Sequence, residues 1–454
     1  MELMAWTQQA LETTNGIKMK AFNHTCIGES HIKSGKVCQD YSLTINLDGL
    51  TAAVVCDGHG SARYFRSDIG AKFAAETTSE LIKEFVEDFD KQQIIGKKFT
   101  QRFAKNDPKN NTKDELYPFF EQLFKSIITT WYQKIEQHSK NNPLTEKERE
   151  LCEAQWIVEF ENGIKIEKSY GCTLMTAVFT PDYWFAFHIG DGKMISLQGN
   201  PIFMEPVPWD DRCFLNKTTS LCDTEPLDEF RYCYCGDGSF PDAVFLGSDG
   251  IDDTFGDGEN LAEFYIKIAK GIVENGEEKT SEEVKKLLPD LSKRGSQDDM
   301  SLAVVYDADK ISAHISSYKS FILKTIETEI SEKKKRVEKF EGEIKTKKTD
   351  YNKALSTKEN AQNKLSSTKA EYEATVKECK EKEEIAKKIV DFITGAKRKV
   401  TALEQSVKDA ESKLSKAEKE LSYSERAYQI AQKEFEEAQK ELEVLLKKKD
   451  EIVH

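Results

Sequence analysis

The absence of proline from the last third of the chain is the feature that most constrains its fold. All ten prolines of the 454-residue sequence lie between Pro108 and Pro289. Residues 311–454 also contain only two glycines, among 32 basic and 28 acidic side chains. Because proline and glycine are the residues that most disfavour helix interiors, this segment can form very long helices. The sequence therefore predicts two parts, residues 1–310 and an α-helical tail at 311–454.

Apolar residues in the tail recur with the spacing of a coiled coil. In its second arm, alternating steps of three and four residues connect Val400, Leu403, Val407, Ala410, Leu414, Ala417 and Leu421, and continue to Leu445. In its first arm, a looser repeat of seven connects Leu323, Ile330, Val337, Ile344, Tyr351, Lys358, Leu365, Tyr372, Cys379, Ala386 and Ile393. A period of 3.5 residues keeps one seam of a helix against a partner and predicts a left-handed supercoil.

Two arrangements of the tail satisfy this pattern. Gly395 lies between the arms, just before the basic residues 397–399, and glycine suits the left-handed conformation at a helix C-terminus. We therefore expect a helical hairpin that turns near Gly395. The alternative is one long helix that pairs with a second chain. In both arrangements the tail serves assembly, through a coiled-coil partner or self-association.

Composition excludes several classes of protein. Residues 1–310 hold 34 basic and 52 acidic side chains, and this acidic balance argues against nucleic-acid binding. The sequence has no apolar stretch long enough to predict a membrane span, and its N-terminus lacks the pattern of a secretory signal. Ten irregularly spaced cysteines favour a reducing compartment. We expect a cytoplasmic protein.

The first part alternates short apolar runs with turn residues. Runs that predict strands lie at 50–56, 174–179, 183–189, 194–197, 243–246 and 300–306. Helices are expected at 69–89, 116–138, 261–273 and 281–288. Strands gathered in an antiparallel core with separate helical layers indicate an α+β fold.

Aspartates stand at the ends of these predicted strands. Asp57 and Asp249 each follow an apolar run, Asp191 lies between two runs, and Asp298 with Asp299 precedes the last. A single Asp-Gly pair between strands is ordinary turn chemistry. Carboxylates at four strand ends, however, supply the rigidly held oxygen ligands that hard divalent cations require. The sequence therefore predicts a divalent-cation site.

The order of these motifs resembles a known family. They run Gly28-Glu29-Ser30-His31, Cys38-Gln39-Asp40, Asp57-Gly58-His59-Gly60, Gly171-Cys172-Thr173, Gly190-Asp191-Gly192, Ser248-Asp249-Gly250-Ile251-Asp252-Asp253 and Gly295 through Ser301. In this order the sequence resembles the metal-dependent type 2C (PPM) Ser/Thr protein phosphatases, in the divergent form frequent in bacteria. The resemblance spans roughly residues 20–307. The tail lies outside it, as does much of the segment about 91–168, which we expect to be a helical insertion.

The resemblance implies an αββα sandwich, two antiparallel sheets flanked by helices, that binds two Mn²⁺ or Mg²⁺ ions. Asp57 matches the carboxylate that bridges both ions, and the carbonyl of Gly58 matches a ligand of one of them. Asp249 and Asp298 match the other direct ligands. Asp40 matches a carboxylate that acts through metal-bound water.

The resemblance also implies the catalytic roles. Asp191 and Asp253 match a third, weaker metal site, and His59 matches the residue proposed to protonate the leaving oxygen. Two ions roughly 3.5–4 Å apart can lower the pKa of a bridging water and stabilise both the attacking and leaving oxygens. A metal-activated water that hydrolyses the phosphate directly needs no cysteine nucleophile.

Some positions depart from the family pattern. Eukaryotic members carry an arginine before a Glu-Asp pair, whereas here Gln39 replaces the glutamate and no arginine precedes it. Lysine lacks the bidentate fork of arginine, so we expect weaker phosphate binding. The candidate phosphate-binding residues are Lys33, Lys36 and Arg63, with His31 and Arg66 as further candidates.

The sequence supports one leading function and two alternatives. The first is metal-dependent hydrolysis of phosphoserine or phosphothreonine on a phosphoprotein, opposed by a cognate Ser/Thr kinase, with the tail for assembly or targeting. The departures at Gln39 and the missing arginine motivate the second, a weak or inactive phosphatase-like scaffold. A third is zinc binding, for which four cysteines are candidates although they lack paired knuckle spacing: Cys213, Cys222, Cys233 and Cys235. We expect that region to form a variable flap beside the active site.

Overall fold

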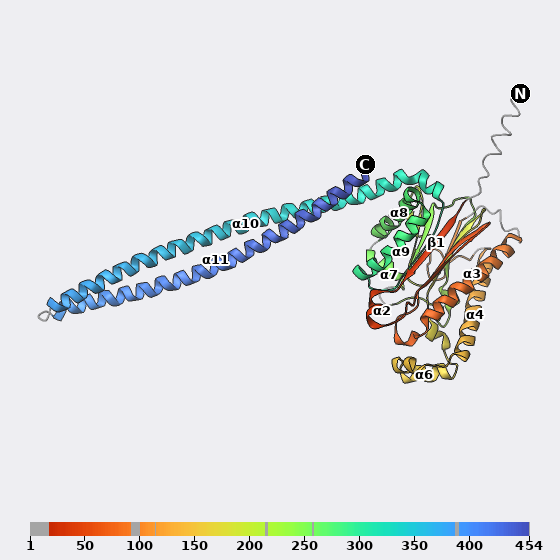
Figure 1. Ribbon diagram of the computed structural model, residues 1–454, viewed down its shortest axis with the longest axis horizontal. Helices are drawn as coiled ribbons and strands as arrows, with labels where there is room; N and C mark the ends of the chain where they lie inside the picture. The colour runs from red at the N-terminus through yellow and green to blue at the C-terminus, as the bar shows by residue number, and fades with distance from the viewer. Residues whose placement is uncertain are drawn as a thin grey trace, which may run out of the picture. The chain divides into compact units, whose positions relative to one another are not determined.

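A computed structural model describes residues 18–91, 100–113, 115–213, 217–256, 258–385 and 390–453. The chain divides into two compact units, Met1–Phe321 and Ile322–His454. The first unit contains two antiparallel sheets between layers of helices (Figure 1). The predicted α+β class and αββα sandwich are therefore confirmed.

Eleven strands of the described residues form the two sheets. The first sheet has the order β1 (Lys20–Cys26), β11 (Met300–Tyr306), β10 (Ala243–Gly247), β7 (Lys193–Leu197) and β8 (Phe203–Met204). The second has the order β2 (Tyr41–Leu47), β3 (Leu50–Cys56), β5 (Leu174–Phe179), β6 (Trp184–Ile189), β9 (Arg231–Cys235) and β4 (Thr100–Ala104). All described pairings are antiparallel.

The central strands are buried on both faces, which explains their continuous apolar runs. On β3, Ala53 and Val55 belong to the core that also contains Val244 and Leu246 of the other sheet. The alternate residues of the strand, such as Val54, belong to the core beneath the helices that cover the second sheet. Side chains that alternate between two apolar cores produce an unbroken apolar run rather than a polar–apolar alternation.

Helices cover the outer face of each sheet. The second sheet packs against α3 (Ser67–Lys91) and α4 (Tyr117–Asn141), and the first against α8 (Gly258–Asn275) and α9 (Glu277–Arg294) (Figure 1). Shorter helices are α2 (Glu29–Ser34), α5 (Glu146–Leu151), α6 (Ala154–Glu161) and α7 (Asp249–Phe255). No helix among the described residues is both long and apolar enough to cross a membrane.

The segment about 91–168 is not wholly helical, and that part of the expectation is wrong. It contains β4, which pairs with β9 at the edge of the second sheet. Its helix α4 packs into the main core, where Phe120 stacks on Tyr232 of β9 with ring centroids 4.2 Å apart. The segment therefore completes both a sheet and a helical layer of the sandwich.

The second unit contains two long antiparallel helix segments. The helices are α10 (Ala308–Ile385), whose first turns belong to the first unit, and α11 (Val390–Val453). Residues further along α10 pair with residues nearer the start of α11, as antiparallel helices do. The pairs are Glu327 with Lys449, Lys333 with Glu441, Lys369 with Glu411 and Tyr372 with Glu404. The seam residues Ala410, Ala417, Ala431 and Ala438 are buried.

Gly395 does not lie at a helix C-terminus, so the predicted capping role is wrong. It lies within α11, after the helix start at Val390. Helix α10 ends at Ile385, and residues 386–389 between the two helices lie outside the described part of the chain. Helix propensity in a Lys/Glu/Ala-rich context outweighs the approximately 1 kcal/mol by which glycine disfavours a helix interior.

Candidate active site

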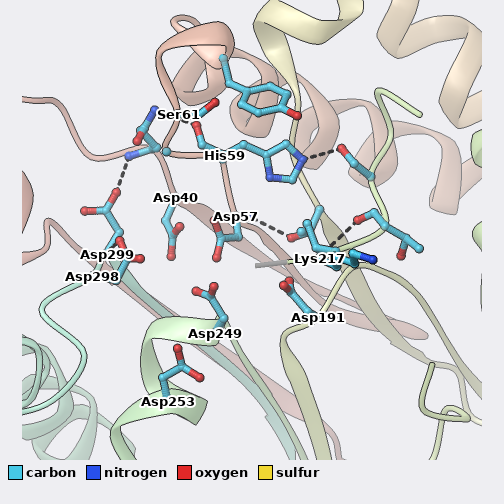
Figure 2. Close-up of a pocket in the computed structure, with 18 of the residues that line it drawn as sticks. Asp40, Asp57, His59, Ser61, Asp191, Lys217, Asp249, Asp253, Asp298 and Asp299 are labelled. Carbon is cyan, nitrogen blue, oxygen red and sulfur yellow. Dashed lines mark hydrogen bonds between the residues drawn. The ribbon is translucent and has the colours of Figure 1, made fainter. Parts of the chain in front are cut away.

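An open cavity of about 1130 Å³ lies where strand ends of both sheets meet. Eight aspartates line it: Asp223, and a group of seven formed by Asp40, Asp57, Asp191, Asp249, Asp253, Asp298 and Asp299. Figure 2 shows the carboxylates of these seven around one space, although they come from distant parts of the sequence. The structure therefore brings all six sequence-predicted carboxylates to a single site.

Strand pairing explains the position of the first two carboxylates. Asp40 precedes β2 and Asp57 follows β3, and the register places Tyr41 of β2 opposite Cys56 of β3. The two aspartates therefore leave the sheet side by side. The backbone N–H of Asp57 donates to the Thr173 hydroxyl (3.1 Å) at the start of the neighbouring strand.

The other sheet supplies further carboxylates by the same geometry. Asp249 is the first residue of α7, separated from β10 by Ser248 alone, and Asp298 lies just before β11. Because β10 pairs antiparallel with β11, the end of one and the start of the other lie together. Asp191 lies in the turn between β6 and β7, while Asp253 lies one helical turn after Asp249 on α7.

The carboxylates raise one another's pKa. Burial raises the pKa of Asp57 well above its ordinary value, and the negative charges of Asp249 and Asp40 raise it further. Burial and the negative charges of Asp191 and Asp298 raise the pKa of Asp249 to about 7, although its contact with Asp57 lowers it. Burial and Asp299 raise the pKa of Asp40, whose Oδ2 has no hydrogen-bond partner among the described residues. Acids held in this way favour the binding of positive charge between them.

The residues at the centre of the site fit hard divalent cations. They offer carboxylate oxygens, the ligand type that Mg²⁺ and Mn²⁺ prefer. Gly58 is pressed against the chain, because a Cβ atom there would lie 2.4 Å from the carbonyl oxygen of Gln39. The backbone beside Asp57 is therefore held firmly, as a ligand-bearing segment must be.

Asp298 lies at the rim rather than at the centre. Its side chain is exposed, and its Oδ1 accepts a hydrogen bond from the N–H of Asp299 (2.8 Å). Among the described residues, His31, Asp298 and Asp299 form a group whose potential ligand atoms all lie within 4.8 Å of one another. Figure 2 shows Asp298 beside Asp299, apart from the pair formed by Asp57 and Asp249.

The carboxylate oxygens of Asp299 accept hydrogen bonds from other segments of the protein and are therefore not available as cation ligands. Its Oδ1 accepts from the N–H of Gly28 (2.6 Å) and lies 2.9 Å from Nδ1 of His31, and its Oδ2 accepts from the N–H of Gln39 (2.6 Å). These contacts fix the segment that carries Asp40. We therefore interpret the His31 group as a structural junction and keep the central carboxylates as the candidate cation ligands.

His59 lies in the wall of the cavity with its ring oriented. Its Nε2 is 2.7 Å from the hydroxyl of Ser220, and its ring meets that of Tyr64 edge-on at 4.7 Å. The Ser220 hydroxyl donates to the carbonyl of Cys172 (3.0 Å). Burial lowers the pKa of His59 to about 4, and the positive charge of Lys168 adds to this effect.

The basic residues predicted to bind phosphate separate into two groups. Lys36 lines the cavity, and its Nζ donates to the carbonyl of Gly60 (2.9 Å). In the described part of the chain, Lys33 and Arg63 do not line it. Lys33 contacts Glu29 (3.5 Å), and Arg63 contacts Glu159 (3.6 Å). Of the three candidates, only Lys36 is placed to meet a phosphate.

Arg66 is a structural residue. Its side chain is buried, with Nε 2.7 Å from a carboxylate oxygen of Glu148 and Nη1 2.8 Å from the carbonyl of Asn142. Burial alone would raise the pKa of Glu148, but hydrogen bonds from Arg66 and Thr145 outweigh it and the pKa is lowered. Arg66 thereby joins the start of α3 to the start of α5.

Replacing Arg66 by methionine is expected to lower the free energy of unfolding by about 2–3 kcal/mol, because the half-buried Glu148 carboxylate and the Asn142 carbonyl lose the hydrogen bonds that the buried guanidinium donates. The matched change Arg63→Met, which removes a more exposed pair, is expected to lower it by less than about 1 kcal/mol. Urea unfolding monitored by circular dichroism measures both. Because the pKa of Glu148 is depressed, its contribution is present above its unfolded pKa and disappears as pH falls through its folded pKa. Equal effects of the two substitutions would contradict this assignment.

Two basic residues at the cavity were missed in the sequence. Arg212 and Lys217 line it, and Figure 2 shows Lys217 near Asp191. Arg212 is already paired with Asp210 and Glu229, whereas Lys217 is exposed. Neither residue belongs to a motif. Their position in a loop between predicted strands was the one sequence feature that could have indicated a role.

The four cysteines proposed for zinc are not gathered into one described site. Cys233 and Cys235 are core residues of β9. The Sγ of Cys213 lies 3.5 Å from the carbonyl of Gly190, and that of Cys222 lies 3.2 Å from the Ser220 hydroxyl. The structure therefore gives the zinc alternative no support. The region expected to form a flap ends where strand β9 begins, at Arg231.

Comparison with protein-family models decides the family. The model described as protein phosphatase 2C matches residues 27–289, more than half of the chain. The chain belongs to the protein phosphatase 2C family. The family match covers six of the eight aspartates that line the cavity, and Asp298 and Asp299 follow its end. No curated protein matches the chain.

Solved structures similar to this protein phosphatase 2C chain include three bacterial proteins. A bacterial serine phosphatase is 14% identical over 64% of this chain and 98% of its own, with a TM-score of 0.36. PppA of Pseudomonas aeruginosa is 15% identical over 64% of this chain and 98% of its own, with a TM-score of 0.36. The Ser/Thr phosphatase Stp1 of Staphylococcus aureus is 13% identical over 64% and 96%, with a TM-score of 0.36.

Proposed function

We propose that the protein is a metal-dependent phosphatase that hydrolyses phosphoserine and phosphothreonine on proteins. The observation that supports this most is the convergence of strand-end carboxylates on one cavity, with Asp57 and Asp249 in hydrogen-bond contact. A phosphate monoester is anionic, so an acidic cavity can accept it only when cations reverse the local charge. Membership of the protein phosphatase 2C family supports the same conclusion.

The central residues would hold two Mn²⁺ or Mg²⁺ ions. Asp57 with the Gly58 carbonyl, together with Asp249 and Asp298, would be the direct ligands, and Asp40 would act from beside them. Asp191 and Asp253 would hold a third, weaker ion. When bound, such cations supply an activated water and stabilise charge on the attacking and leaving oxygens. Since Asp298 lies at the rim, its side chain must turn inward to share an ion with Asp249.

The chain's own residues orient the substrate and the proton donor. Ser220 fixes the ring of His59 at the cavity wall, which supports the proposed role of His59 as the group that protonates the leaving oxygen. Lys36 and Lys217 supply positive charge at the entrance. We propose Lys217 as the main phosphate-binding side chain, because the Nζ of Lys36 already donates to Gly60.

Replacing Lys217 by alanine is expected to raise KM for a phosphothreonine peptide about tenfold, the equivalent of losing one charged hydrogen bond of about 1.5 kcal/mol. The control Lys33→Ala removes a lysine that is held by Glu29 outside the cavity and is expected to leave KM unchanged. Steady-state kinetics with both variants measures the difference. Equal KM values for Lys217→Ala and wild type would remove Lys217 from the phosphate site.

The proposed function is tested by assaying the purified chain on phosphoserine and phosphothreonine peptides. We expect turnover of order 1 s⁻¹ with Mn²⁺ or Mg²⁺ and none after chelation. Turnover that persists in chelator would reject the metal-dependent mechanism. Ordered cation binding without turnover on any phosphopeptide would instead favour the scaffold alternative.

The environment of Gln39 supports the enzyme over the scaffold. Its side-chain N–H groups donate to the carbonyl of His59 (3.1 Å) and the hydroxyl of Ser67 (2.6 Å). Gln39 thus braces the segment that carries Asp57 and His59. The replacement that motivated the scaffold alternative has a supporting role beside the site and removes no candidate metal ligand.

We also propose that the two units have different functions. Residues up to Phe321 would form the catalytic unit, and Ile322–His454 a coiled-coil hairpin for assembly or targeting. The pairs between α10 and α11 support pairing within one chain. A cytoplasmic Ser/Thr kinase that phosphorylates the same substrate would be the functional partner.

A further inference from the structure

Helices α5 and α6 expose apolar side chains that no step of the proposed mechanism uses. Residues 145–165, here called the α5–α6 platform, contain Leu151, Val158 and Ile164, which are 60%, 55% and 52% exposed. The inner face of the platform is already packed, since Phe160 of α6 is buried in the main core. The three exposed residues are therefore not needed for the fold. Exposed apolar side chains gathered in one segment are typical of an interaction surface.

The platform borders the catalytic cavity at two places. The Sγ of Cys152 donates to the carbonyl of Ala62 (3.3 Å), which directly follows the cavity residue Ser61. Just beyond the platform, the Nζ of Lys168 lies 3.7 Å from the carboxylate of Asp223, which also lines the cavity. A phosphoprotein that places its phosphoresidue in the cavity covers the surface around the mouth. The platform is therefore within reach of the residues that neighbour the phosphoresidue.

Polar contacts hold the platform in place against the sandwich. The buried guanidinium of Arg66 contacts the Glu148 carboxylate (2.7 Å) and donates to the carbonyl of Asn142 (2.8 Å). At the start of α5, Thr145 and Glu148 form a capping box. A surface that is already ordered loses little conformational entropy when a partner binds, and this favours docking.

The charges of the platform favour a basic partner. The platform contains six acidic and three basic side chains. Three of the acidic residues, Glu146, Glu150 and Glu153, are exposed, and none of them forms an ion pair with another residue that the structure describes. Apolar side chains beside unpaired carboxylates complement a segment that combines apolar residues with lysine or arginine.

Weak binding of the phosphate gives such a surface a purpose. Of the three basic residues that the sequence predicted to bind phosphate, only Lys36 lines the cavity, while Lys33 and Arg63 contact carboxylates elsewhere. Binding energy from parts of a substrate that do not react can orient the group that does. Docking on the platform would therefore compensate for the missing arginine.

We propose that the α5–α6 platform is a docking surface for the phosphoprotein substrate and binds a substrate segment that combines apolar and basic residues. The proposal rests on the proposed function, because the docked protein must present its phosphoresidue to the cavity. The platform would select substrates by their sequence outside the phosphoresidue, and the cavity would carry out the hydrolysis.

A library of phosphothreonine peptides tests this selection. Each peptide carries randomised arms of about ten residues on both sides of the phosphothreonine, and an extended arm of this length spans at most about 35 Å. The full chain dephosphorylates the library with Mn²⁺, and mass spectrometry identifies the early products. The assay is repeated with the triple variant Leu151→Ser, Val158→Ser, Ile164→Ser. The control is Leu47→Ser, since Leu47 is 53% exposed and lies at the opposite end of the β2–β3 pair from the cavity.

For wild type and Leu47→Ser we expect the early products to be enriched in peptides that carry apolar and basic residues together in one arm. On a peptide chosen from these products, the triple variant should lower kcat/KM about tenfold, which corresponds to about 1.4 kcal/mol. Its rate on p-nitrophenyl phosphate should be unchanged. Peptide turnover by wild type without such enrichment, or the same enrichment with the triple variant, would overturn the proposal. Hydrolysis of no peptide at all by wild type would instead overturn the proposed function.

A second variant tests the charged part of the surface and leaves its apolar side chains in place. Glu150→Gln combined with Glu153→Gln should remove the enrichment in lysine and arginine but keep the enrichment in apolar residues. Unchanged enrichment in lysine and arginine would show that the platform does not select for positive charge, contrary to the proposal.

Sedimentation velocity tests a second copy of the chain as the alternative occupant. We expect wild type and the triple variant to sediment alike. A triple variant that dissociates an oligomer and keeps the peptide preference would assign the platform to a second copy and overturn the proposal.

Discussion

Asp57→Asn is expected to reduce Mn²⁺-dependent turnover of a phosphothreonine peptide by at least about a thousandfold. Asp57 lies beside Asp40 and Asp249 (Figure 2), and its loss would remove the carboxylate that both cations would share. Cation stabilisation of the reacting oxygens is worth several kcal/mol, and about 4 kcal/mol corresponds to a thousandfold in rate. Initial rates at saturating substrate and Mn²⁺ measure this effect.

Folding and cation binding separate this result from a simple loss of structure. Without metal, Asp57→Asn should be at least as stable as wild type, because the substitution removes a buried acid from a cluster of acids. Mn²⁺ should raise the melting temperature of wild type but not of Asp57→Asn, since a ligand stabilises only the state that binds it. The control Asp48→Asn changes an exposed aspartate at the opposite end of the same strand pair and should retain full activity. A thousandfold loss in Asp48→Asn, or none in Asp57→Asn, would contradict the assignment.

Shortening the chain to end at residue 310 is expected to lower its free energy of unfolding by about 5 kcal/mol relative to a chain that ends at Phe321. The first turns of α10 bury Ile311 and Tyr318 in the sandwich unit. The hydroxyl of Tyr318 (2.5 Å) and the Nδ1 of His314 (2.6 Å) both contact Oδ2 of the buried Asp242. The shorter chain loses the apolar contacts and leaves a buried carboxylate without partners.

Urea unfolding of the two shortened chains measures this difference directly. The single change Tyr318→Phe isolates one contact to Asp242, and we expect it to lower the free energy of unfolding by about 1–3 kcal/mol. Identical unfolding midpoints for the chains ending at 310 and 321 would show that the start of α10 contributes nothing. The sequence placed the boundary at 310 because the composition changes there, whereas the structural unit extends to Phe321.

The strand-end aspartates could be predicted because strand and turn chemistry are local. Asp57 directly follows the apolar run of β3, and Asp298 and Asp299 directly precede that of β11. Their convergence needed only the rule that paired antiparallel strands bring ends and starts together. Whether each side chain points into the cavity or away from it depends on tertiary packing. The sequence therefore did not predict the rim position of Asp298.

Strands with mixed composition could not be recognised as readily. Tyr232 and Tyr234 of β9 face the core beneath α3 and α4, while Cys233 and Cys235 face the core between the sheets. This is an alternation between two apolar environments, but the cysteines suggested a metal site. In β4, only Phe103 and Ala104 are buried, so the strand resembled the charged segment around it.

Residues that act through distant contacts left no local pattern. Arg212 and Lys217 belong to no motif, and they line the cavity only because the loop that carries them lies beside it. Lys33 and Arg63, by contrast, are near motifs in sequence but are held by Glu29 and Glu159. Proximity in sequence to a catalytic motif was therefore a poor guide to the cationic side of the site.

The most direct test of the central claim is the location of bound Mn²⁺ by anomalous diffraction from crystals soaked in Mn²⁺. We predict two strong peaks beside Asp57, one of them shared with Asp249 and with an inward-turned Asp298. Peaks confined to the group formed by His31, Asp298 and Asp299, or no peak near Asp57, would contradict the account.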